Sequence, residues 1–213
     1  MTDGQASFDN FISVFKSGNW RLEDTPHYVS FKAISGTSVT IYANKPKFEK
    51  EGQEEISQLF KERNLKPQVI VHRGHSYHTY NTIEAISPDA RLVYLGSCGG
   101  YNNIKAVLDR SPAAHILSTK GTGTMVVNDP LLKSIAEHIR KGQGINWPRF
   151  KKEAETALGR NGAFQHYIFP HENLGVMFLK AYNRILEQGN TPRPDAKGSS
   201  PIREENSART LPI

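Results

Sequence analysis

A histidine and the only cysteine of the chain stand at matching places behind two short apolar runs. His75 comes three residues after the run at 68–72, and Cys98 comes three residues after the run at 91–95. A cysteine attacks an acyl carbon as the thiolate, and a nearby imidazole takes the thiol proton and later protonates the leaving amine. These residue types therefore indicate nucleophilic catalysis by a thiol and an imidazole.

Glycines surround the cysteine in the stretch Gly96, Ser97, Cys98, Gly99 and Gly100. Glycine adopts backbone conformations that other residues avoid and lets the backbone come close to a ligand. We therefore expect a sharp turn after the apolar run, with the thiol at its tip.

Three histidines compete for the role of the base. His72, His75 and His78 lie within seven residues. His72 belongs to the apolar run, which favours a structural role, and His78 lies further along the loop, so the sequence favours His75. The spacing matches neither a zinc finger nor a zinc-binding helix, and no acidic residue follows before Glu84, so we predict no metal site.

The surrounding pattern alternates strands with helices. Short runs rich in β-branched residues are typical of buried parallel strands, and their alternation with helices predicts an α/β fold with a mostly parallel sheet covered on both faces. Functional groups collect beyond the carboxyl ends of such strands. We expect parallel strands at 68–72, 91–95, 114–118 and 124–127, a hairpin at 27–34 and 38–43, and helices at 7–16, 48–64, 79–86, 102–110, 130–140, 147–158 and 173–187. Residues 163–169 suit either a strand or an irregular segment.

The length of 213 residues fits one sizeable α/β domain. We place this domain at residues 1–187. From 188 to 213 the composition shifts to glycine, proline, serine and charged residues, which predicts a disordered tail.

Composition excludes several classes of protein. The net charge of +6 invites a nucleic-acid interpretation, but the basic residues are interleaved with 21 acidic ones, so we expect no nucleic-acid partner. One cysteine excludes an intrachain disulfide. No apolar run approaches the ~20 residues that span a bilayer, and no signal peptide is visible, so we expect no membrane association and, if the chain is complete, a cytoplasmic location.

The motifs around His75 and Cys98 resemble those of the caspase-hemoglobinase group of cysteine peptidases, which includes caspases, metacaspases, legumain, gingipain, separase and CHAT domains. In that group an apolar strand leads to Gly-His or His-Gly, and a later strand leads to a small residue and Cys-x-Gly. Gly74-His75 and Ser97-Cys98-Gly99-Gly100 match these elements in this order. The resemblance covers roughly residues 28–140 and implies a three-layer α-β-α fold and cysteine endopeptidase activity.

The resemblance also implies roles for individual residues. His75 would be the general base and acid, Cys98 the nucleophile, and the backbone N–H groups of Ser76, Cys98 and Gly99 the oxyanion hole. Ser76 stands where many members of the group have glycine. The substrate would be a peptide or protein, no cofactor would be required although some members are activated by calcium, and members often belong to larger multidomain proteins.

Three further residues are candidates for substrate binding. Tyr77 and Tyr101 flank the two motifs, where they would line a substrate groove or cover the edge of the core. Asp129 follows the expected strand at 124–127, where it would select a basic substrate residue or cap the next helix, and the helix cap is favoured.

Two other functions remain open. One is an interaction domain that keeps the fold without turnover. The other is a hydrolase or amidotransferase, because Gly96-Ser97-Cys98-Gly99-Gly100 fits the nucleophile elbow of those families, in which the histidine follows the nucleophile. The histidines available for that arrangement are His115, His138, His166 and His171. A phosphatase loop is excluded, since Ile104 stands where that loop requires arginine.

Overall fold

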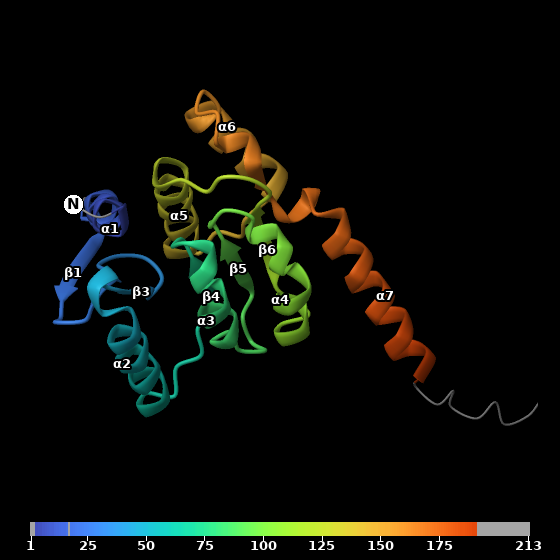
Figure 1. Cartoon of the computed structure of the whole chain (residues 1–213), viewed down its shortest axis with the longest axis horizontal. Helices are drawn as coiled ribbons and strands as arrows, with labels where there is room; N and C mark the ends of the chain where they lie inside the picture. The colour runs from blue at the N-terminus through green and yellow to red at the C-terminus, as the bar shows by residue number, and fades with distance from the viewer. Residues whose placement is uncertain (1–2, 17, 191–213) are drawn as a thin grey trace, which may run out of the picture.

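The computed structural model describes residues 3–16 and 18–190 of the chain. In these ranges the chain forms two β-sheets with helices packed around them (Figure 1). One sheet is mixed and carries the loops of His75 and Cys98. The other is an antiparallel meander near the N-terminus.

The mixed sheet has the order β4-β5-β6-β7. The first three strands are parallel and β7 runs antiparallel to β6. The predicted α/β fold with a mostly parallel sheet is therefore confirmed. The strands are β4 (Val69–His72), β5 (Leu92–Leu95), β6 (His115–Thr119) and β7 (Tyr167–Ile168).

Both faces of this sheet are covered, which explains why every residue of β5 is buried. Val93 and Leu95 belong to one buried apolar cluster, with α3 (Thr79–Glu84) and α4 (Ile104–Arg110). Leu92 and Tyr94 belong to the cluster on the opposite face, because successive side chains of a strand point to opposite sides. That second cluster includes residues of α5 (Met125–Arg140) and α6 (Trp147–Leu158).

The antiparallel sheet has the order β1-β2-β3. The predicted hairpin corresponds to β2 (Tyr28–Ala33) and β3 (Thr40–Asn44). Strand β1 (Trp20–Asp24) was not predicted from the sequence, because it is a polar edge strand in which only Trp20 is buried. Trp20 and Phe31 join the same apolar cluster as Tyr94 of the mixed sheet, so one core links the two sheets.

The remaining long helices are α1 (Asp3–Phe15), α2 (Glu49–Glu62) and α7 (Leu174–Asn190). Helix α7 continues three residues beyond position 187, where the sequence placed the end of the domain. The rest of the predicted tail, residues 191–213, lies outside the described residues. None of the helices within 3–16 and 18–190 has the length and apolar character needed to cross a membrane.

The strand predicted at 124–127 is wrong. Thr124 precedes the first turn of α5, and the residues after it are helical. Val126 is exposed and Val127 is buried, as the helical period requires once the helix packs on the sheet. Pro130 therefore lies inside the helix rather than in its first turn. Because proline has no N–H, one backbone carbonyl of the preceding turn lacks its usual helical donor.

Candidate functional site

The two motif loops leave the sheet side by side. His72 of β4 pairs with Leu95 of β5 in the parallel register, and the N–H of Gly96 donates to the carbonyl of His72 at 2.8 Å. A second link joins the loops, a hydrogen bond of 3.3 Å between the hydroxyls of Thr79 and Ser97. The equal spacing from the paired residues therefore brings His75 and Cys98 to the same edge of the sheet, as the sequence predicted.

Both residues line one open cavity of about 1360 Å³. It is lined by the carboxyl end of β4 and the loop that follows, by Cys98, and by residues of α1, α2, α3 and the start of α5. Pockets for small ligands usually hold 300–1,000 Å³, so this cavity has room for a longer ligand. The lining includes His72, His75, Ser76, His78, Cys98 and Asn128.

Cys98 is exposed at the tip of a tight turn. Gly99 follows it with a φ of 66°, in the left-handed region that favours glycine. The turn is also closely packed: a Cβ atom on Gly100 would lie 2.3 Å from the carbonyl oxygen of Leu95. The predicted sharp turn is present, and two of its glycines are required by its geometry.

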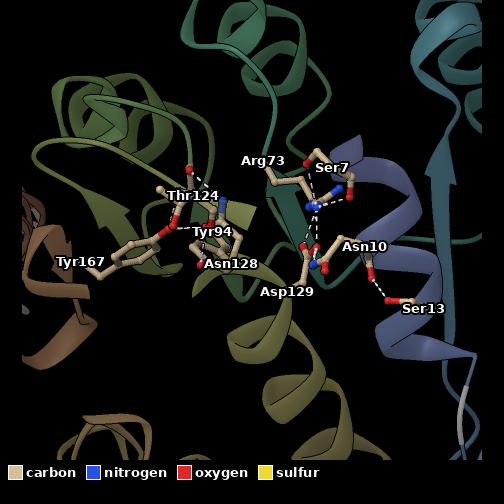
Figure 2. Close-up of polar contacts among 10 residues, drawn as sticks. Ser7, Asn10, Ser13, Arg73, Tyr94, Thr124, Asn128, Asp129 and Tyr167 are labelled. Atoms are coloured by element: carbon tan, nitrogen blue, oxygen red, sulfur yellow. Dashed lines mark hydrogen bonds and ion pairs between the residues drawn. The ribbon is translucent and has the colours of Figure 1, made fainter. Parts of the chain in front are cut away.

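A buried polar network holds the start of this turn (Figure 2). The side-chain amide of Asn128 donates to the carbonyl of Gly96 at 3.0 Å, while its oxygen accepts from the hydroxyls of Tyr94 at 2.7 Å and Tyr167 at 2.9 Å. The hydroxyl of Thr119 also donates to the carbonyl of Ser97. The backbone just before Cys98 is therefore fixed from β5, β6, β7 and α5.

The two tyrosines stay protonated in this network. Burial raises the pKa of Tyr167 to about 12 and that of Tyr94 well above its ordinary value. This network was not predicted from the sequence. A tyrosine inside the fully buried run at 92–95 was the available signal, because a buried phenol needs a hydrogen-bond partner.

His72 has a structural role, as the sequence favoured. Its Nε2 lies 3.0 Å from the carbonyl oxygen of His75, which can only accept, so we assign the proton to Nε2. Nδ1 then accepts from the hydroxyl of Thr82 at 2.8 Å. Burial lowers the pKa of His72, so the ring is neutral near pH 7 and both of its nitrogens are engaged.

His75 is exposed beside the cavity, and its ring stacks on Tyr77 with 5.3 Å between ring centroids and an angle of 9°. Throughout the part of the chain that the structure describes, no hydrogen bond joins its ring to Cys98. The two residues therefore share a cavity without forming a bonded pair. Catalytic hydrogen bonds are often long or poorly aligned without substrate.

His78, the third histidine of the loop, faces α2. Its Nε2 lies 3.4 Å from a carboxylate oxygen of Glu49, and its ring packs on Tyr77 with 4.2 Å between centroids. This carboxylate holds the ring toward α2, on the wall of the cavity formed by that helix.

The three backbone N–H groups predicted to form the oxyanion hole differ in whether they already have a hydrogen-bond partner. Within the described residues, the backbone N–H groups of Ser76 and Cys98 have no hydrogen-bond partner, and both residues line the cavity. The N–H of Gly99 instead donates to the carbonyl of Gly121 at 2.9 Å, so it is occupied. Ser76 shows no positive φ, so the serine that replaces glycine there is not strained.

The residues predicted to bind substrate are not gathered at the cavity. Tyr77 is exposed but covers His75 and His78 rather than lining the walls. Tyr101 packs on the apolar cluster beneath α4, with the amine of Lys120 5.1 Å above its ring centroid. Neither tyrosine lines the cavity, because each is engaged by neighbouring side chains.

Asp129 is neither a substrate contact nor a helix cap in this structure. It lies within α5, fully buried, with its carboxylate 2.6 Å from the guanidinium of Arg73 and 2.6 Å from the amide of Asn10 (Figure 2). Burial raises its pKa, while Arg73 and Asn10 act in the opposite direction. Arg73 also donates to the backbone carbonyl of Ser7 at 2.9 Å, so this ion pair fastens α1 and α5 to the loop that carries His75.

One of the later histidines lies close to the cysteine turn. A Cβ atom on Gly121 would meet the ring of His166 at 2.6 Å, and the carbonyl of Gly121 accepts the N–H of Gly99. His166 therefore flanks the turn from the side of β7. His115 starts β6 at the opposite end of the sheet, His138 bonds the carbonyl of Ser134 within α5, and His171 packs on Phe169.

Comparisons with protein-family models, curated proteins and solved structures find no match for this chain. The likeness to the caspase-hemoglobinase group therefore rests on the motifs and on their places at two strand ends. Among residues 3–16 and 18–190, no three histidine, cysteine, aspartate or glutamate side chains gather as metal ligands.

Proposed function

We propose that this protein is a cysteine peptidase in which Cys98 is the nucleophile and His75 the general base and acid. The observation that carries the proposal is the juxtaposition of the two loops. An exposed thiol on a glycine turn and an exposed imidazole follow adjacent parallel strands and line one cavity. The motif resemblance to caspase-like peptidases gives the same two residues the same roles.

The proposed reaction follows from these groups. His75 takes the thiol proton, and the thiolate of Cys98 forms a bond to the substrate carbonyl carbon, whose oxygen becomes an oxyanion. The unpartnered N–H groups of Ser76 and Cys98 are the donors available to it. The C–N bond then breaks as the amine takes the proton from His75, and water hydrolyses the thioester with His75 as base.

This reaction requires the ring of His75, which is stacked on Tyr77, to form a hydrogen bond with the thiol of Cys98. An aromatic stack contributes about 0.5–1.5 kcal/mol, which is small beside the free energies involved in catalysis. The stack therefore restrains the imidazole without preventing its movement toward Cys98. The cysteine turn, by contrast, is held by the Asn128 network and supplies a fixed target.

A second candidate places the base on the other side of Cys98. His166 touches Gly121, which is bonded to the residue after Cys98. This order, nucleophile before histidine, is that of hydrolases and amidotransferases with a nucleophile elbow. The cysteine is the nucleophile in both schemes, which differ only in the histidine that accepts and returns the proton.

A library of fluorogenic peptides tests the proposal with four forms of the full chain: wild type, Cys98→Ala, His75→Ala and His166→Ala. We expect wild-type cleavage that is lost in Cys98→Ala and reduced about 10²–10⁴-fold in His75→Ala, the usual contribution of a general acid–base residue. His166→Ala should retain activity.

The reverse ranking of the two histidine variants would support the second candidate. Cleavage of no peptide by folded wild-type protein would contradict the hydrolase proposal and favour an interaction domain. Circular dichroism of each variant distinguishes loss of chemistry from loss of fold.

A further inference from the structure

Helix α7 is anchored to the body of the protein along one side only. Val176 is buried and Leu179 packs against the same apolar cluster beneath α3 and α4. The amine of Lys180 donates to the backbone carbonyls of Ala113 at 3.1 Å and Ala114 at 2.7 Å. These contacts hold the first half of the helix. Its C-terminal turns extend away from the other elements in Figure 1.

The other side of α7 is an exposed apolar stripe. Isolated apolar residues are common on protein surfaces, but a continuous stripe of large ones marks an interaction site. Most of the positions are spaced by three or four residues, so they share one side of the helix. The α7 stripe consists of Leu174, Met177, Phe178, Tyr182, Ile185 and Leu186, with exposed fractions between 48% and 74%.

We propose that the α7 stripe pairs with the α7 stripe of a second copy of this chain. Antiparallel pairing about a two-fold axis near Lys180 sets Leu174 opposite Leu186 and Phe178 opposite Tyr182. A two-fold dimer uses the same surface on both copies, and the order of residues in this stripe suits that symmetry.

The size of the stripe agrees with such an interface. A large apolar side chain has roughly 200 Å² of surface when fully exposed, so the exposed surface of the six residues amounts to roughly 700 Å² per chain. Each partner in a standard stable interface contributes about 800 Å². Pairing of the stripe therefore supplies most of the area of a stable dimer.

The charges around the stripe favour a second copy over a lipid surface. Helices that lie on membranes carry several lysines and arginines along the polar side. Helix α7 has only Lys180 and Arg184 as basic residues, and Lys180 is already bonded to two carbonyls. No residue of α7 lines the cavity of Cys98, so pairing leaves that cavity open and is independent of the proposed peptidase activity.

Sedimentation equilibrium of the full chain over the micromolar range tests the proposal. We expect a monomer–dimer equilibrium whose dissociation constant rises at least ~100-fold in the double variant Phe178→Glu and Ile185→Glu. The reason is that burial of an unpaired carboxylate in an apolar interface costs free energy. Ile34→Glu alters an exposed apolar residue outside the stripe and should leave the equilibrium unchanged. A thermal melt of each variant confirms that it is folded.

Cross-linking then tests the orientation in a Cys98→Ser background. Antiparallel pairing predicts disulfides between Leu174→Cys chains and Leu186→Cys chains when the two are mixed, and few within either alone. A wild-type monomer at every concentration, a dimer unaffected by the double variant, or binding of the monomer to phosphatidylcholine–phosphatidylserine vesicles would each overturn the proposal.

Discussion

The two sides of Cys98 are built differently. On the buried side, the carbonyls of Gly96 and Ser97 are bonded to Asn128 and Thr119, and the partners of Asn128 are themselves buried. On the open side, the ring of His75 is exposed and has one aromatic stack as its contact. The backbone of the nucleophile is therefore held by hydrogen bonds, while the ring of the base that we assign to it is restrained only weakly, by its stack on Tyr77.

This difference suits a covalent mechanism. A fixed thiol and fixed backbone donors set the position of the substrate carbonyl, because stabilisation of the oxyanion depends on donors that are already in place. The imidazole must instead serve two atoms in turn, the thiol and the leaving amine, so a mobile ring is an advantage. Changes to the buried side should therefore affect folding, and changes to the open side should affect reactivity.

The largest effect is expected from Asn128→Leu. This substitution leaves the hydroxyl of Tyr94 and the carbonyl of Gly96 buried without partners, and each such group costs about 1–3 kcal/mol. The hydroxyl of Tyr167 loses its bond to Asn128 but keeps its bonds to the backbone of Thr124. We expect urea unfolding to show a loss of about 3–5 kcal/mol. Asn81→Leu, at an exposed asparagine of α3, is the control, and an equal effect of both substitutions would contradict the role of the network.

A somewhat smaller loss is expected from Asp129→Leu. It leaves the mostly buried guanidinium of Arg73 without its carboxylate, and breaking one partner of such a pair costs about 3–5 kcal/mol when burial is complete. Arg73 retains some exposure, so we expect about 2–3 kcal/mol. The double variant with Arg73→Leu should lose less than the sum of the single losses, and simple additivity in this cycle would show that the pair is not coupled.

The stability of the protein should depend on pH through His72. Burial lowers its folded-state pKa below the ordinary value of 6.5, so at mildly acidic pH the unfolded chain binds a proton that the native state does not. The free energy of unfolding is therefore complete above about pH 6.5 and decreases as the pH falls below that value. We expect His72→Gln to be less stable at pH 7 but to lose this dependence, and urea titrations at several pH values test it.

The smallest effect is expected from Tyr77→Ala. Removal of the stack frees the ring of His75, and its ~0.5–1.5 kcal/mol should raise the rate of peptide cleavage by roughly 2- to 12-fold, with a change in stability within ~0.5 kcal/mol. Tyr80→Ala is the control, because it removes another exposed tyrosine, whose hydroxyl donates to Glu84 instead. A rate increase in both variants, or a decrease in Tyr77→Ala alone, would contradict the restraint that we assign to the stack.

The sequence predicts the open side of Cys98 better than the buried side. The strand before Cys98 is fully buried and the strand before His75 is at least partly buried at every residue. Each therefore leaves a mostly apolar run in the sequence, whose end could be located from the residues alone. His75 and Cys98 each follow the last residue of their strand by three positions. Strand β1 has no such run, because it buries only Trp20, and it was missed for that reason.

The buried side depends on contacts between residues far apart in the chain. Asn128 lies 34 positions from Tyr94 and 39 from Tyr167, so its role follows only from the packing of α5 across the sheet. The error at 124–127 has the same origin, because a short apolar run fits a strand or a helix until its neighbours are known. Asp129 was likewise interpreted as a cap because its distant partner Arg73 could not be identified.

Alkylation of Cys98 with iodoacetamide, followed across the pH range, tests the central claim most directly, because this is the only cysteine in the chain. An unassisted thiol reacts slowly between about pH 6 and 7, below its ordinary titration range near 8.5. We predict that wild type reacts at least ~10-fold faster than His75→Ala in this window, and that His166→Ala reacts like wild type. Equal rates for wild type and folded His75→Ala would contradict the assignment of His75 as the partner of Cys98.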